Sequence, residues 1–142
     1  LLGYIETEPA PPDWNDLNGT YVLHHIVTEA LWDENRTITN YEIGDSYFGM
    51  TLSSDTIVAE INNGTGFMRY NFGQAAANSN ITCTLKDYLL IMNCETPVDL
   101  YLNGNMQSQF ELSIVQDGET YLVLEDSNGY YNFSYYMKKS TN

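Results

Sequence analysis

The chain has 142 residues, 43% of them hydrophobic, and a formal net charge of -14 from 19 acidic and 5 basic side chains. This length suits one domain with a sizeable core. The negative charge repels phosphate backbones and anionic lipids, which argues against nucleic-acid and membrane-surface binding. No stretch approaches the roughly 20 apolar residues of a membrane-spanning helix. We therefore expect a soluble domain without a membrane span.

The N-terminal segment differs in composition from the rest. Three of the four prolines lie at Pro9, Pro11 and Pro12, where they disfavour helix. We predict an extended arm over residues 1–16 and a single β-domain over 17–142. The chain begins with Leu and shows no basic segment followed by a long apolar run, so we expect a mature exported protein, extracellular or at the cell surface.

From Gly19 onward, short β-type runs alternate with turn residues, and no apolar period of 3.6 persists beyond about two turns. Asn-Gly and Asp-Gly turns favour hairpins between consecutive strands. The predicted fold is all-β, an antiparallel meander of eight or nine strands closing into a barrel, because closure removes exposed edges. A two-sheet sandwich is the alternative, and segment 29–44 is predicted as a helical turn or a flap over the barrel mouth. The predicted strands are 19–28, 45–53, 55–61, 66–74, 79–84, 88–94, 107–116, 119–126 and 130–138.

Two cysteines bracket "CTLKDYLLIMNC", which has the pattern of two strands joined by a turn. Cysteines on paired strands can lie within bridging distance, so we predict a Cys83–Cys94 disulfide, with a pair of buried thiols as the alternative. Five Asn-x-Ser/Thr sequons are glycosylation candidates if the host has that pathway. They are Asn18, Asn35, Asn63, Asn80 and Asn132.

Three phrases, "LNGTYVLHHI", "MTLSSDTIVAEI" and "FELSIVQDGETYLVLEDSNGYYNFSYYMKK", resemble bacterial lipocalin-like domains of small exported proteins and lipoproteins. The resemblance spans residues 17–139 in outline. It implies a ligand-binding barrel whose first strand carries a Trp packed at the closed end against a late basic residue. Tyr21 stands at the Trp position, with Lys138 or Lys139 as the basic candidate. Members of that family often bind apolar or amphipathic small molecules.

Catalytic and metal sites find little support in the pattern. His24 and His25 are adjacent, and adjacent strand residues point to opposite faces, so the pair is not expected to chelate a metal. No nucleophile elbow or phosphate-binding loop is present. We expect no catalytic residue, no metal and no cofactor, and a protein that is not an enzyme.

The main functional prediction is an exported binding module that holds an apolar or amphipathic small molecule inside the barrel. Side-chain alternation and barrel geometry give the cavity candidates Tyr21, His25, Phe48, Met50, Met68, Tyr70, Phe110 and Leu112.

An alternative function is a structural subunit of an extracellular filament or surface layer. It rests on residues 1–5, "LLGYI", which could join a neighbouring copy as an added strand and make a homo-oligomer.

Overall fold

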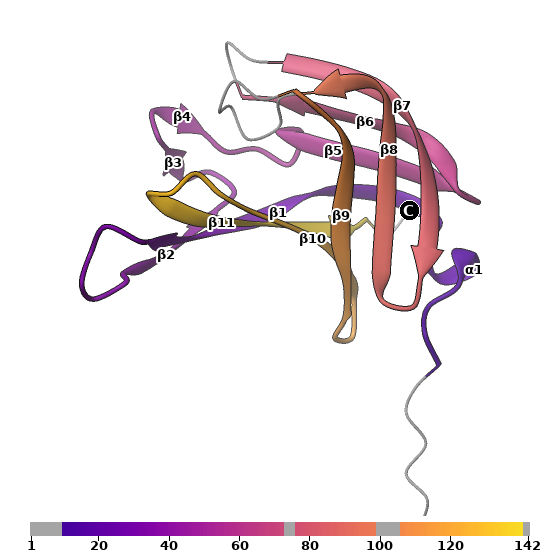
Figure 1. Cartoon of the computed structure of the whole chain (residues 1–142), viewed down its shortest axis with the longest axis horizontal. Coiled ribbons are helices and arrows are strands. Elements are labelled where there is room, and N and C mark those ends of the chain that lie inside the picture. Colours follow the sequence, from indigo (N-terminus) through magenta and orange to yellow (C-terminus); the bar gives the residue numbers. More distant parts are fainter. Residues whose placement is uncertain (1–9, 73–75, 99–105, 141–142) are drawn as a thin grey trace, which may run out of the picture.

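A computed structural model describes residues 10–72, 76–98 and 106–140, and its main feature is one antiparallel sheet that closes on itself (Figure 1). Eight strands follow one another around the wall in the order β1-β5-β6-β7-β8-β9-β10-β11, and β11 pairs again with β1. The predicted all-β closed barrel is therefore confirmed, and the sandwich is not formed. The elements are α1 (Trp14–Leu17), β1 (Gly19–Ala30), β2 (Ile38–Glu42), β3 (Ser46–Tyr47), β4 (Met50–Thr51), β5 (Ile57–Asn62), β6 (Thr65–Asn71), β7 (Ala76–Lys86), β8 (Leu89–Val98), β9 (Gln107–Gln116), β10 (Thr120–Ser127) and β11 (Tyr131–Lys139).

Tight turns set the meander, as the Asn-Gly signal predicts. Asn62 pairs with Thr65, so Asn63 and Gly64 alone form the β5–β6 turn, with φ values of 50° and 89°. Both residues adopt the left-handed backbone that a two-residue hairpin needs. Each strand of the meander consequently lies beside the next one in sequence.

Two regions differ from the predicted strands. The predicted strand 45–53 is the short β3–β4 hairpin, because Phe48 and Gly49 take positive φ values of 47° and 89° and reverse the chain. Segment 29–44, predicted as a helical turn or flap, contains β2, whose residues are mostly exposed. Its sequence lacks a buried face, so alternation could not reveal it.

β1 is a long strand that changes partners along one edge. Gly19 to Val22 pair with β5, whereas His25 to Glu29 pair with β2. The other edge pairs with β11 from Tyr21 to Ala30. In Figure 1 the outer parts of β1 and β11, together with β2, extend to one side beyond the rest of the barrel.

One end of the barrel is closed by α1. Asp13 and Asp16 form a reciprocal capping box that starts this helical turn. The hydroxyl of the buried Tyr21 donates to the Leu17 carbonyl at 2.7 Å, and Lys139 Nζ donates to the Asp16 carbonyl at 2.8 Å. The end of the predicted 1–16 arm is thus helical and packed on the barrel rather than extended. Residues 1–5, on which the filament hypothesis depends, lie outside the described residues.

Gly19 explains how Lys139 crosses the closed end. A Cβ at Gly19 would lie 2.8 Å from Lys139 Cε, and its φ is 145°. Glycine therefore leaves both the space and the backbone freedom for the lysine stem. Tyr21 and Lys139 are paired in the β1–β11 register, and their side chains donate to adjacent carbonyls of α1.

The predicted Cys83–Cys94 disulfide is absent, and both thiols are free. The two-residue turn at Asp87 and Tyr88 fixes a register in which Cys83 pairs with Met92 and Cys94 with Ile81. The cysteines are therefore diagonal neighbours on the inner face. Diagonal positions are about 7–8 Å apart, beyond the usual reach of a disulfide.

Buried side chains from every strand of the barrel wall meet in one hydrophobic cluster. In the described part of the chain, no helix is long and apolar enough to cross a membrane.

Candidate functional site

An apolar pocket opens at the end of the barrel opposite α1, and we call it the aromatic mouth. It has a volume of about 210 Å³. Six of its seven lining residues are aromatic. The seven lining residues are Tyr47, Phe48, Phe72, Asn128, Tyr131, Phe133 and Tyr135.

Aromatic rings from three parts of the chain build the mouth. Alternation along β11 points Tyr131, Phe133 and Tyr135 to one face. The β3–β4 hairpin brings Phe48 to this row, with its ring centroid 5.6 Å from that of Tyr131 and nearly perpendicular to it. The ring centroid of Phe72, the residue after β6, lies 6.3 Å from that of Tyr135. The spacings match preferred aromatic contacts.

Tyr47 anchors the hairpin to the barrel. It is buried and hydrogen-bonds Tyr135. Burial, and then the adjacent Tyr135 and Tyr41 phenols, raise the pKa of Tyr47, so its hydroxyl stays protonated at neutral pH. Phe48, next in sequence, is 62% exposed despite being a large apolar residue. The hairpin therefore combines a fixed residue with an exposed one.

The predicted cavity candidates fall into several environments. Met68, Tyr70, Phe110 and Leu112 are buried together in the barrel core, whereas Tyr21 lies at the closed end. Phe48 lines the mouth, and the half-buried Met50 packs against the hydrophobic core of the barrel. Phe133 and Tyr135 belong to the core and Tyr131 packs against it, but all three also line a pocket that the sequence analysis did not predict. The signal was an alternating aromatic row at one end of the last strand.

His25 does not face the interior, contrary to prediction. A β-bulge inserts His24 as an extra residue, since Leu23 pairs with Met137 but His25 pairs with Tyr136. Bulges re-aim side chains. Leu23 and Ile26 are buried, and the two histidines between them are only partly so. Both imidazoles consequently lie on the outer wall, and the expectation that they point to opposite faces is wrong.

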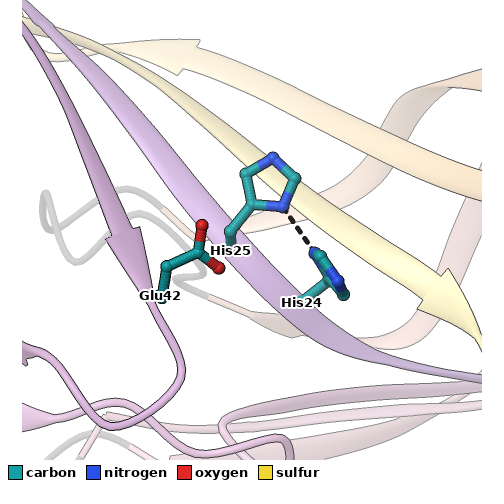
Figure 2. Close-up of side chains that lie close together, drawn as sticks. All are labelled: His24, His25 and Glu42. Atoms are coloured by element: carbon teal, nitrogen blue, oxygen red, sulfur yellow. Dashed lines mark hydrogen bonds between the residues drawn. The ribbon is translucent and has the colours of Figure 1, made fainter.

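Glu42 joins the two histidines from the next strand. It lies directly opposite His25 in the β1–β2 register. Figure 2 shows the three side chains gathered on one side of β1, with a dashed line between the imidazoles. His24 Nδ1 and His25 Nδ1 are 2.7 Å apart, and one ligand atom from each of the three residues falls within 4.8 Å of the others. Burial, and then His24, lower the pKa of His25, while Glu42 opposes this shift.

The sequon asparagines are all on the surface or partly so. Asn18 is engaged with a second sequon: its Nδ2 donates to Asn63 Oδ1, and its Oδ1 accepts from the Asn63 backbone N–H. Asn80 and Asn132 donate from Nδ2 to Glu95 and Glu29. Glycosylation of any of the five sites, Asn35 included, remains a prediction.

Comparisons with known proteins give fold-level likeness only. No family model and no curated protein matches the chain. A lipocalin-like protein from Bacteroides uniformis ATCC 8492 is 10% identical, with a TM-score of 0.47 over 88% of this chain and 99% of that chain. An uncharacterized protein from Bacteroides eggerthii DSM 20697 is 11% identical, with a TM-score of 0.48 over 90% of this chain and 100% of that one. Membership of the lipocalin-like family stays a prediction.

Proposed function

We propose that this protein is a non-catalytic, exported binding module that holds an apolar or amphipathic small molecule at the aromatic mouth. The observation that carries the proposal is the wall of six aromatic side chains around a pocket of about 210 Å³. An apolar cavity of about 150 Å³ in another protein accommodates benzene. The mouth therefore suits one ring or a short alkyl segment, with the remainder of a larger ligand outside.

The interior of the barrel favours this location over the predicted central cavity. Met68, Phe110 and Leu112 are each at most 3% exposed and belong to the packed core. Side chains that already fill the space between the walls leave their apolar surface unavailable to a ligand. Larger depressions occur on the outer wall, but one of about 550 Å³ is lined in part by Glu29, Glu125 and Asp126. Carboxylates suit an apolar ligand poorly.

The net negative charge of the protein favours some ligands over others. With a net charge of -14, the protein disfavours approach of an anion, whereas a cation gains from both the long-range field and the electron-rich faces of the rings. We therefore expect affinity to decrease from cation to neutral molecule to anion for ligands of one size. The set para-bromobenzylamine, para-bromobenzyl alcohol and para-bromobenzoate varies charge while keeping the ring.

The two tryptophans supply a test, because they lie at opposite ends of the barrel. Trp32 contacts the mouth residue Tyr131 at a centroid distance of 6.5 Å, and Trp14 lies in α1 beside Gly64. Bromine quenches tryptophan fluorescence on contact. Titration of Trp14→Phe with para-bromobenzyl alcohol should quench Trp32 in a saturable way, whereas the matched Trp32→Phe variant should keep its Trp14 emission.

Equal quenching in both variants, or quenching of Trp32 that rises linearly without saturation, would contradict the location. A saturable signal that survives Tyr131→Ala would contradict the role of the aromatic row. The export step is tested separately, by locating the protein in fractionated cells.

A further inference from the structure

The outer wall of the barrel carries a polar cluster that the aromatic mouth does not use, formed by His24, His25 and Glu42. We propose that these three residues form a zinc-binding site. Two imidazoles and one carboxylate, with water in the fourth position, are a common zinc ligand set. The site is independent of the proposed small-molecule pocket, because its residues and those of the mouth do not overlap.

Backbone register builds this cluster, so it is not a chance meeting of mobile side chains. The bulge at His24 turns two consecutive imidazoles to one face, and pairing of β1 with β2 places Glu42 directly opposite His25. Without the bulge, His24 and His25 would point to opposite sides of the wall. Bulges at ligand sites commonly serve to aim a side chain in this way.

The contact between the imidazoles indicates what a metal would replace. Two ring nitrogens at 2.7 Å repel each other unless a proton lies between them. Zinc at about 2.0–2.1 Å from each nitrogen sets them roughly 3.3 Å apart in a tetrahedron. The separation of the two nitrogens therefore needs to lengthen by roughly 0.6 Å for both to bind one ion.

Aromatic neighbours hold both rings near this arrangement. His25 stacks on Tyr136 with a centroid distance of 4.3 Å, and His24 meets Tyr121 edge-on at 5.7 Å. Asn40 Nδ2 donates to Glu42 Oε1 at 2.6 Å. Such outer contacts restrict ligand side chains and raise metal affinity.

The surrounding charges are compatible with a cation. Lys138, the basic group on the β11 side, is paired with Glu119 at 2.9 Å, and the Asp45 carboxylate accepts from the Glu42 backbone N–H. With few oxygen ligands, the cluster is a poor site for calcium, which takes six to eight.

The chain contains two histidines, so any imidazole signal reports on this site. The experiment is a Zn²⁺ titration of the full chain, free of a purification tag, followed by histidine-selective NMR and by calorimetry. We expect one ion per chain, with both imidazole spin systems shifting at the same molar ratio. Ca²⁺ at the same concentration should leave these signals unchanged.

Variants assign the ligands. His24→Ala and His25→Ala should each weaken Zn²⁺ binding roughly tenfold or more, and Glu42→Gln should weaken it less. Glu111→Gln removes an exposed carboxylate from the outer face of β9 and is the matched control, with affinity expected within about twofold of the native chain. Circular dichroism of each variant checks that the barrel is intact.

Three results would overturn the proposal. The first is unchanged Zn²⁺ affinity in the folded His24→Ala/His25→Ala double variant, which keeps both cysteines and would move the site to the thiols. The second is a loss of Zn²⁺ affinity in Glu111→Gln as large as that in the histidine variants, which would indicate diffuse binding to the acidic surface. The third is the absence of any imidazole shift at saturating Zn²⁺.

Discussion

The two ends of the barrel use aromatic side chains in opposite ways. At the closed end, Tyr21 is fully buried and its hydroxyl is bonded to the Leu17 carbonyl. At the mouth, Phe48 and Trp32 are 62% and 66% exposed. Burial removes apolar area from water and stabilises the fold, whereas exposed apolar area remains available to a partner. We therefore expect substitutions at the closed end to affect mainly stability, and loss of an exposed ring at the mouth to affect mainly the proposed binding.

Substitution at the closed end should give the largest effect. Tyr21→Ala leaves a cavity between α1 and the wall and an unpaired Leu17 carbonyl, so the free energy of unfolding should fall by about 3–5 kcal/mol. Denaturant unfolding measures this change. Tyr130→Ala, at a side chain that is 68% exposed, is the control and should change stability by less than about 0.5 kcal/mol. Similar losses of unfolding free energy in the two variants would contradict a special contribution of the closed end to stability.

A covalent link tests the strand register near the closed end. Met92 lies opposite Cys83, so the Met92→Cys variant should form a cross-strand disulfide with Cys83 under mild oxidation. Closing this short loop should raise the free energy of unfolding by about 1 kcal/mol net of the lost methionine packing. Thiol counting by mass spectrometry and unfolding with and without reductant measure both effects. The native chain is the control and should keep two free thiols; a Cys83–Cys94 bridge in it would contradict the register.

The register between β7 and β8 could not be predicted from the sequence. Alternation and Asn-Gly turns predicted the meander and most strand positions, because these signals are local. Closure of the barrel was predicted because it removes exposed sheet edges. Whether Cys83 meets Met92 or Cys94 depends on the number of residues in one turn, which Lys-Asp-Tyr does not specify. A register shift of two residues moves the two cysteines from opposite positions to diagonal ones.

The same limit applies to the candidate sites. Nothing in "LHHI" indicates a bulge, since the extra residue is defined only by pairing with β11. The mouth needed the β3–β4 reversal at Phe48, a residue type that rarely takes a positive φ. The aromatic row of β11 was predictable, but the hairpin that completes the pocket was not.

Phe48 offers a way to separate binding from stability at the mouth. Glycine accepts a positive φ without strain, so Phe48→Gly should change the free energy of unfolding by less than about 1 kcal/mol. Loss of the ring should weaken binding of para-bromobenzyl alcohol by roughly fivefold to tenfold, the effect of about 1 kcal/mol. Fluorescence titration in the Trp14→Phe background measures the affinity. Val115→Ala, which changes a partly exposed apolar residue of β9, is the control. An equal loss of affinity in this variant would contradict a specific site at the mouth.

Alkaline pH should act through buried ionisable groups, and the share of the Cys83 thiol near the closed end should be the smallest effect. Burial, and then the adjacent Cys94, raise the pKa of the Cys83 thiol from its usual 9.0 to about 11. Above pH 9 the unfolded chain releases this proton while the folded chain retains it. The folded state thus binds more protons, and the free energy of unfolding decreases as pH rises from 9 toward 11. Because the thiol is only partly buried, solvent screening reduces the slope below the full one-proton value.

Cys83→Ala removes this contribution, so its stability should decline less steeply than that of the native chain between pH 9 and 11. Unfolding curves across this range, with reductant present, give the difference in slope. Tyr21 and Tyr47 are also buried with raised pKa values, so they add a common decline to both proteins. Phe48→Gly should follow the native slope, because no ionisable group is removed at the mouth. Identical slopes for Cys83→Ala and the native chain would place the Cys83 thiol in contact with solvent rather than in the barrel interior.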